Sequence, residues 1–221
     1  MPMSTTADWL DADDDLDPDT MKVPENPEHR RIVDAIGIVA SRALRPHTMV
    51  YRDMNWYPPD GGNAVAPDIM TLPSGVLPHE GKSYRQTDVD MPFPSAVVEV
   101  PSATDTFDGL RAKSARLNAL GVDVYIISTD AIVGGAMRVA PGSTALVNWT
   151  GKPIAALGGL SIEMAEGSVA VRTPEGLLIS TDAELLDMLA AGREAAEAQA
   201  ELERARATQL EARLRALGVE P

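Results

Sequence analysis

The chain has 221 residues, 44% of them hydrophobic and 24% charged, which is typical of a globular protein with one main core. It contains no cysteine, so disulfide frameworks, thiolate zinc sites and cysteine nucleophiles are excluded. Its net charge of −14 disfavours nonspecific coating of nucleic acid, because such binding relies on lysine and arginine to neutralise phosphates.

The first residues carry much of the negative charge. Residues 1–28 hold nine acids and one lysine, a charge of −8, so the rest of the chain carries −6. Residues 1–24 show almost no apolar periodicity, which predicts a disordered acidic arm. This arm is too acidic for a secretory signal, and no apolar run approaches the roughly 18 residues of a membrane span. We therefore expect a cytoplasmic protein with no membrane segment.

A helix is predicted to begin at Asn26, which can cap it, with Pro27 in the first turn and Glu28 near the positive end of the helix dipole. Apolar residues then recur at helical spacing until Pro46 ends the pattern. Five arginines before Asp60 could form a basic patch that binds nucleic acid. The acidic arm would then compete with nucleic acid for this patch. The arginines are Arg30, Arg31, Arg42, Arg45 and Arg52.

Two strands and a long irregular segment are expected next. The strands are predicted at 48–54 and 65–72, with a turn at 58–63 between them. Residues 73–94 are rich in proline and polar side chains. Because irregular segments of this length inside a compact domain are usually functional or mobile, we expect a flap there.

The segment 95–101 is an apolar run bounded by prolines, which is typical of a buried central strand. It contains Glu99, and an ionised carboxylate in that position needs a cation, a metal or several hydrogen-bond donors. A helix capped by Asp105 or Thr106 and ended by Gly121 leads to a second apolar strand at 122–128. Strand, helix and strand at this length form a crossover between parallel strands, so we predict an α/β (α+β) fold with a mixed sheet flanked by helices.

Short strands are predicted at 136–149, 154–156 and 160–179, the last of them a hairpin around Glu166-Gly167. A long or interrupted helix then runs from Asp182 to Leu217, with Gly218 as its cap. The expected organisation is an arm at 1–24, a main domain at 25–180 and a C-terminal helical segment at 181–221.

The C-terminal helix carries a seven-residue apolar seam that Arg193 and Glu203 interrupt. This pattern predicts a helix that binds a partner or dimerises, and a solvated, partly frayed tail is the alternative. The seam residues are Leu186, Leu189, Ala196, Ala200, Ala207, Leu210, Leu214 and Leu217.

Three residues are the candidates for chemistry: Asp68, Glu99 and Lys113. The phosphate-loop, serine-hydrolase and metal-binding histidine patterns are incomplete in this sequence. Two carboxylates at neighbouring strand ends would form an oxygen site of the kind that Mg²⁺ prefers, and a nearby ammonium can orient water and stabilise charge on a phosphate. By spacing alone, Asp68 also fits an ordinary turn acid and Lys113 a solvated lysine.

Four segments resemble the Uma-two family of restriction-endonuclease-like proteins, which belongs to the PD-(D/E)XK nuclease superfamily. They are Ala66-Pro67-Asp68-Ile69, Val97-Val98-Glu99-Val100-Pro101-Ser102, Lys113 and Gly121-Val122-Asp123-Val124-Tyr125. The resemblance extends from about Pro27 to Ala190. It implies a restriction-endonuclease-like core, in which Asp68 and Glu99 bind Mg²⁺ or Mn²⁺ and Lys113 is the lysine of the site.

The superfamily pattern is not followed in full. Its lysine usually lies two residues after the acid, but Pro101 occupies that position here. The resemblance implies that Lys113, on the following helix, takes over. Glu28 on the opening helix is a possible additional acid.

Two function hypotheses follow from this sequence. The first is a metal-dependent endonuclease that hydrolyses phosphodiester bonds in DNA. The second is a catalytically inactive nuclease fold that binds or assembles partners through the C-terminal helix. A homodimer could form through that helix or through the nuclease core.

Overall fold

The computed structural model describes most of the chain beyond the acidic arm. The described residues are 27–60, 62–73, 83–86, 92–102, 105–128, 134–140, 142–143 and 145–216. The predicted arm at 1–24 and most of the predicted flap at 73–94 lie outside them. The chain divides into two compact units, the first ending at Ser180 and the second beginning at Thr181.

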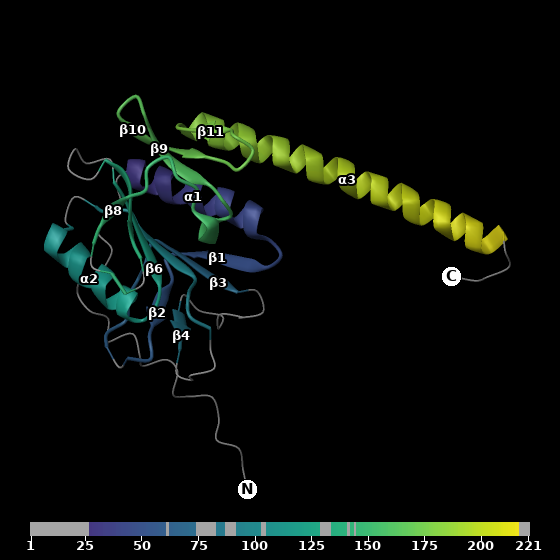
Figure 1. Ribbon diagram of the computed structural model, residues 1–221. Coiled ribbons are helices and arrows are strands. Elements are labelled where there is room, and N and C mark those ends of the chain that lie inside the picture. The colour runs from purple at the N-terminus through teal and green to yellow at the C-terminus, as the bar shows by residue number, and fades with distance from the viewer. Residues whose placement is uncertain are drawn as a thin grey trace, which may run out of the picture. The chain divides into compact units, whose positions relative to one another are not determined.

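A six-stranded mixed sheet forms the centre of the first unit (Figure 1). Its strands are, in spatial order, β1 (Thr48–Arg52), β3 (Ile69–Pro73), β5 (Ala96–Glu99), β6 (Asp123–Ser128), β7 (Gly135–Val139) and β8 (Val147–Asn148). Only β5 and β6 are parallel among these neighbours, and the other pairs are antiparallel. The predicted mixed sheet is thereby confirmed.

The parallel pair is joined by helix α2 (Phe107–Ala119), as the sequence predicts. Thr106 is the N-cap, because its Oγ1 accepts a hydrogen bond from the Gly109 N–H at 3.1 Å. Gly121 ends the turn after the helix with a φ of 84°, a conformation that suits glycine. Local capping therefore fixes both ends of the helix that carries Lys113.

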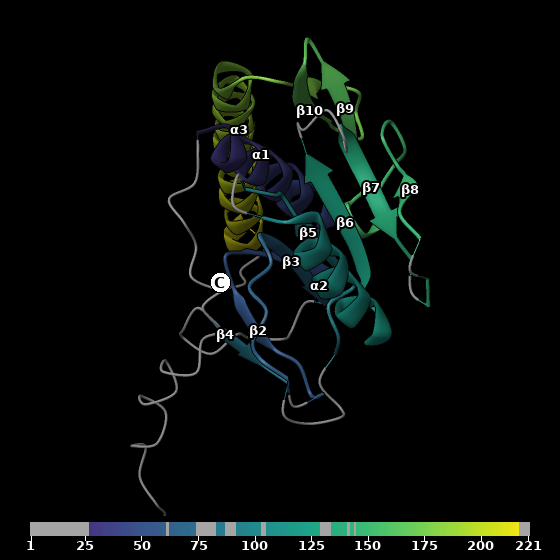
Figure 2. The same cartoon turned by 90° about the vertical axis from the view of Figure 1, so that its left-hand side faces the viewer.

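Both faces of the central sheet are buried. Met70 and Val97 lie in one buried cluster with Leu117 of α2. Figure 2 shows α2 beside the strands of this sheet. Ile69 and Val98 point to the opposite face, and both are 0% exposed. A carboxylate at the end of these strands therefore emerges from a dry core.

Helix α1 (Pro27–Leu44) begins where the proline and acid predict and packs against β1 and β10. Its buried face includes His29, Ile32, Ile36 and Ala40. The first residue of this face is polar, so the helix carries an imidazole into the interior near its N-terminus.

Three predicted strand boundaries are wrong, each for a local reason. Strand 48–54 ends at Arg52, because Asp53 takes a φ of 55° that breaks the extended backbone. The strand predicted at 65–72 begins only at Ile69. Pro67 precedes it and has no backbone N–H to donate to a neighbouring strand. At 154–156 the chain forms the 3₁₀ helix η3 (Ala155–Leu157) instead of a strand.

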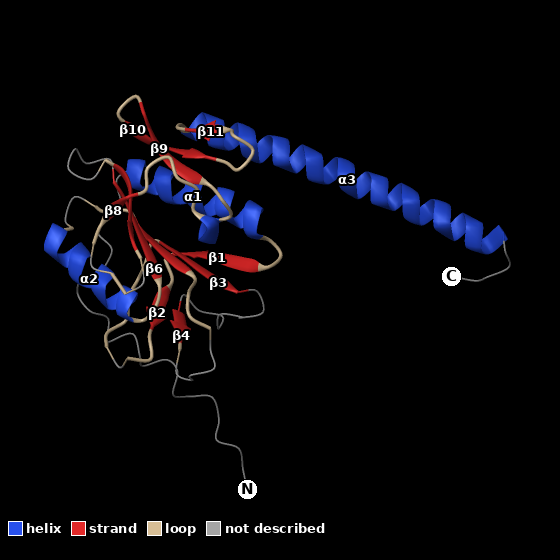
Figure 3. Ribbon diagram, viewed as in Figure 1, coloured by secondary structure: helices blue, strands red, loops and turns tan. Residues whose placement is uncertain are grey.

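Two smaller sheets complete the first unit (Figure 3). Strands β2 (Asn55–Tyr57) and β4 (Ser83–Arg85) pair in parallel. Strands β9 (Ser161–Ala165), β10 (Ser168–Arg172) and β11 (Leu178–Ile179) form an antiparallel sheet. The predicted hairpin turn is confirmed, because Glu166 and Gly167 both have positive φ, as a tight two-residue turn requires.

The second unit is built on one helix, α3 (Asp182–Ala216), which is continuous over 35 residues. Thr181 and Glu184 form a capping box: the Glu184 N–H donates to Thr181 Oγ1, and the Thr181 N–H donates to Glu184 Oε2. Alanine, leucine, glutamate and arginine dominate the helix, and these residues favour helical backbone.

Candidate active site

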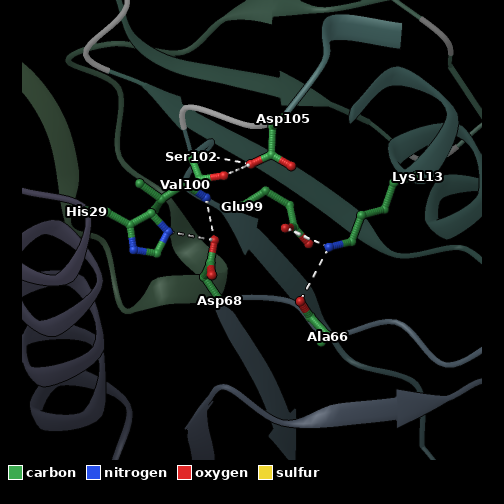
Figure 4. A network of polar contacts seen from close by, with 8 residues as sticks. All are labelled: His29, Ala66, Asp68, Glu99, Val100, Ser102, Asp105 and Lys113. Carbon is green, nitrogen blue, oxygen red and sulfur yellow. Dashed lines mark hydrogen bonds and ion pairs between the residues drawn. The ribbon is translucent and has the colours of Figure 1, made fainter. Parts of the chain in front are cut away.

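Asp68 directly precedes β3, and Glu99 is the last residue of the neighbouring strand β5. In the antiparallel register of β3 and β5, Ile69 pairs with Val98. Asp68 directly precedes Ile69 and Glu99 directly follows Val98, so the two acids lie at the same end of the two strands. Figure 4 shows both carboxylates at this end of the two strands. Two acids that are 31 positions apart in sequence are therefore brought together.

The Asp68 carboxylate is buried and held by groups from two other elements. Its Oδ2 accepts a hydrogen bond from the Val100 N–H at 2.7 Å and lies 3.6 Å from His29 Nε2 on α1 (Figure 4). The residue is 7% exposed. The hydrogen bond from the Val100 N–H offsets part of the cost of withdrawing a carboxylate from water, and it fixes the direction of the carboxylate.

Glu99 is held by Lys113. The Lys113 Nζ donates to Glu99 Oε2 at 2.8 Å and to the Ala66 carbonyl at 3.3 Å. The Glu99 side chain is 8% exposed and that of Lys113 27%. A charge-assisted bond of this length in partly desolvated surroundings is stronger than a surface ion pair. The ammonium thus joins the end of β5 to the residues just before β3.

Local structure places Lys113 on the correct side of α2. Lys113 is four residues before Leu117, so both lie on one face of the helix, and Leu117 is fully buried against the sheet. Ahead of the helix, Asp105 Oδ2 accepts hydrogen bonds from the N–H and the Oγ of Ser102, at 2.6 and 2.8 Å. These hydrogen bonds link Ser102, shortly after β5, to Asp105, just before the N-cap of α2.

A polar cleft of about 480 Å³ lies between α1 and the end of β1. Residues 50–53 line it together with Arg30, Val33 and Asp34 of α1. The Asp53 N–H donates to the Asp68 main-chain carbonyl at 3.2 Å, which links one wall residue of the cleft to the backbone of Asp68. Burial raises the pKa of the Tyr51 hydroxyl in its wall, which keeps that group protonated at neutral pH.

The Uma2 model, described as "Putative restriction endonuclease", matches residues 17–132, which is more than half of the chain. This chain belongs to the Uma2 family. Membership supports a nuclease function, and the resemblance of the sequence to the Uma-two family is confirmed.

One solved structure is similar to this Uma2 protein at low sequence identity. It is a protein from Anabaena variabilis described as a "putative nuclease belonging to DUF820", with 13% identity and a TM-score of 0.49, covering 62% of this chain and 76% of that chain. Among curated proteins no significant relative matches. None of the helices in the described part of this Uma2 protein combines the length and apolar character that a membrane span requires.

The structure accounts for the proline that departs from the superfamily pattern. Pro101 follows the end of β5 and has no amine to offer. Lys113 reaches Glu99 from α2 instead, so the ammonium that the pattern requires is present from another element. In this Uma2 protein Lys113 thus pairs with Glu99, while the Asp68 carboxylate is held by the Val100 N–H.

The fourth candidate, Glu28, has different surroundings. Its Oε1 accepts a hydrogen bond from Ser168 Oγ at 2.9 Å and lies 3.8 Å from Arg31 NH2. The next residue, His29, is the one that reaches Asp68. The signal that could have identified His29 is its position three residues before Ile32, on the buried face of α1.

A hard cation such as Mg²⁺ would need both Asp68 and Glu99 as ligands. Among the residues that the structure describes, no group of three or more histidines, aspartates and glutamates is arranged to hold a metal ion. Mg²⁺ usually retains several waters and uses one or two carboxylates together with a substrate phosphate. Asp68 and Glu99 supply that minimum. Restriction-endonuclease-like families generally use a divalent metal, in keeping with this donor set.

Proposed function

We propose that this Uma2 protein is a Mg²⁺- or Mn²⁺-dependent endonuclease that hydrolyses phosphodiester bonds in DNA. One observation carries the proposal: Asp68 directly before β3 and Glu99 at the end of β5 lie at the same end of these two paired strands, with the Lys113 ammonium 2.8 Å from Glu99. Two carboxylates and one amine near the same end of two paired strands are the kinds of group that metal-assisted phosphodiester hydrolysis needs.

Asp68 and Glu99 would hold the ion, and the family's general use of a divalent metal supports this assignment. When bound, the ion would lower the pKa of a coordinated water and help to stabilise the charge that develops on the phosphate. The Val100 N–H keeps one oxygen of Asp68 in place, so the carboxylate is oriented before any ligand arrives.

Lys113 would act on the substrate. The Lys113 side chain is 27% exposed, so its ammonium could donate to a phosphate oxygen or to the attacking water while Glu99 and Ala66 hold it in position. A fixed cation aimed at developing negative charge stabilises the transition state more than the ground state.

The polar cleft supports DNA as the substrate. Arg30 lies in its wall with a side chain that is 78% exposed, and Arg52 lies opposite on β1; both contact Asp34. Arg30 Nε is 4.0 Å from Asp34, which is a weak surface pair that a phosphate could replace. The cleft would therefore lead the DNA backbone toward Asp68.

Plasmid nicking with Mg²⁺ or Mn²⁺ tests the assignment. We expect Asp68→Asn and Glu99→Gln each to lower the nicking rate by at least about 100-fold, because each removes a charged ligand. Lys113→Met should lower it by about 10- to 1000-fold through lost stabilisation of the phosphate charge. The nicking rate of the Glu28→Gln variant shows whether Glu28, the possible additional acid, contributes to the reaction.

The matched control is Glu163→Gln on β9. This substitution also neutralises one glutamate that pairs with a basic side chain, Arg172, at 2.5 Å. It should leave nicking unchanged. Wild-type rates in the Asp68 and Glu99 variants, with folded protein shown by circular dichroism, would refute the catalytic assignment.

A catalytically inactive binding or assembly protein is the second candidate. The net charge of −14 and the Glu99–Lys113 pair, in which each charge already has a partner, favour it. Calorimetric titration with Mg²⁺ distinguishes the two functions. Binding that Asp68→Asn and Glu99→Gln abolish supports the nuclease, whereas no binding by the folded wild type supports the second candidate.

A further inference from the structure

The leucines of α3 are exposed along most of its length. Leu186 is 64% exposed, Leu189 41% and Leu210 60%, and Leu214 is 38% exposed near the end of the helix. A row of exposed leucines on one helix marks an interaction surface more often than a solvated face. The question is which partner fits this particular row.

The heptad pattern defines two series of positions along α3. The first series, at position a, contains Leu186, Arg193, Ala200, Ala207 and Leu214, and the second, at position d, contains Leu189, Ala196, Glu203 and Leu210. Each series contains one charged residue, and the two charges have opposite sign. Charges at these positions usually specify the partner and its register.

A parallel pair of α3 helices in register is disfavoured by these charges. It would place Arg193 against Arg193 of the partner subunit at one layer and Glu203 against Glu203 of the partner subunit at another. Like charges in desolvated positions cost several kcal/mol.

We propose that α3 pairs with α3 of a second copy of this chain as an antiparallel coiled coil centred near Ala198. Antiparallel helices pack position a of one chain against position d of the other. In the register centred near Ala198, Arg193 meets Glu203 of the partner subunit, and the symmetry of the dimer forms this ion pair twice.

The same register matches the apolar residues. Leu186 packs against Leu210 of the partner subunit and Leu189 against Ala207 of the partner subunit, and the alanines at 196 and 200 meet near the axis. Shifting by one heptad in either direction would set Arg193 and Glu203 against apolar residues instead. Charge complementarity thus selects one register among those that the leucines allow.

The length and the local contacts of α3 suit this pairing. The helix extends over residues 182–216, about 52 Å, and its midpoint lies within one residue of the proposed centre. Nearly the whole helix would therefore overlap with its partner. Arg193 presently contacts Glu197 at 2.7 Å, with side chains 80% and 62% exposed, which is a weak surface pair that leaves the guanidinium available.

Charge reversal in the full-length protein tests the register. We expect a particle of twice the 23.5 kDa chain mass in sedimentation equilibrium. Arg193→Glu alone and Glu203→Arg alone should each weaken the dimer by at least about tenfold, because each creates a like-charged layer. The double variant Arg193→Glu/Glu203→Arg should restore the wild-type affinity to within about threefold, because it only exchanges the partners.

Engineered cysteines test the direction, and the absence of native cysteine makes them unambiguous. When Leu189→Cys and Ala207→Cys chains are expressed together, the antiparallel pair predicts a disulfide between the two variants and little between identical chains. Disulfides between identical chains would show a parallel pair and overturn the proposal. A monomeric wild type, or a dimer that neither single charge reversal weakens, would also overturn it.

Discussion

Glu99 and Lys113 form an ion pair with limited access to water, since their side chains are 8% and 27% exposed. Removing one partner leaves the other charge without compensation, whereas removing both does not. We expect Lys113→Met to lower the free energy of unfolding by about 3 kcal/mol, and Lys113→Met/Glu99→Met to recover most of that loss. Urea unfolding followed by circular dichroism measures both values.

Lys152→Met is the control for this double-mutant cycle. Lys152 is exposed, and its Nζ donates to the Asn148 carbonyl at 3.0 Å, so its replacement should change stability by less than about 0.5 kcal/mol. A double variant as unstable as Lys113→Met would show that packing by the lysine stem, and not the uncompensated charge of Glu99, accounts for the loss.

The sequence predicts the candidate site only to the extent that it predicts the strands beside which the site residues lie. Glu99 was recognisable because a carboxylate inside an apolar run demands a partner, and the structure supplies Lys113. His29 was not, because its contact with Asp68 depends on how α1 packs against the sheet, and that packing leaves no local trace beyond an amphipathic pattern. Spacing rules for metal-binding histidines do not detect a single imidazole that reaches a distant acid.

At the scale of elements, α2 is anchored to the turn before β3 by Arg116. Its guanidinium forms two hydrogen bonds of 3.0 Å to Asp60, whose Oδ1 also accepts the Gly62 N–H. The bidentate pair holds the pKa of Asp60 below its ordinary value. The helix that carries Lys113 and the turn that leads to Asp68 are therefore tied together.

The lowered pKa of Asp60 predicts an acid-dependent loss of stability. A carboxyl with a depressed pKa stabilises the fold fully above its unfolded pKa, and this contribution disappears as the pH falls through the folded pKa. We expect Arg116→Gln to lower the free energy of unfolding by about 0.5–1 kcal/mol at pH 7. The loss should become progressively smaller below about pH 4, where Asp60 of the unfolded chain is protonated. The midpoints of urea unfolding for the wild type and Arg116→Gln, at pH 7 and at pH 3, measure this difference.

Arg111→Gln, on the same helix, is the matched control. Arg111 is exposed, so its replacement should have little effect at either pH. If the cost of Arg116→Gln stayed constant between pH 7 and pH 3, the pair with Asp60 would not be its cause.

Elements with strong local signals were predicted well, and those that depend on distant contacts were not. Capping residues and apolar runs located α1, β5, α2 and β6, because these signals act within a few residues. The parallel pair of β2 and β4 joins segments about 28 residues apart through three residues each, so no periodicity reveals it. At η3, the positive φ of Gly158 turned an apolar segment away from extended backbone.

At the scale of the whole molecule, the charge of the chain works against the proposed substrate. The net charge is −14, and residues 1–22 contribute seven acids and one lysine, so their removal would bring it to −8. Negative charge that competes with DNA for Arg30 and Arg52 would lower affinity most where screening is weak, since the Debye length is about 30 Å at 0.01 M salt and 10 Å at 0.1 M.

We therefore expect deletion of residues 1–22 to raise the affinity for duplex DNA by about three- to tenfold at low salt, with a smaller gain at 0.2 M salt. Fluorescence anisotropy with a labelled duplex measures this, without metal so that cleavage does not interfere. A full-length variant in which the seven aspartates of this segment become asparagine separates charge from length, and it should match the deletion. Equal affinities of wild type and both variants at every salt concentration would show that the acidic arm does not regulate DNA binding.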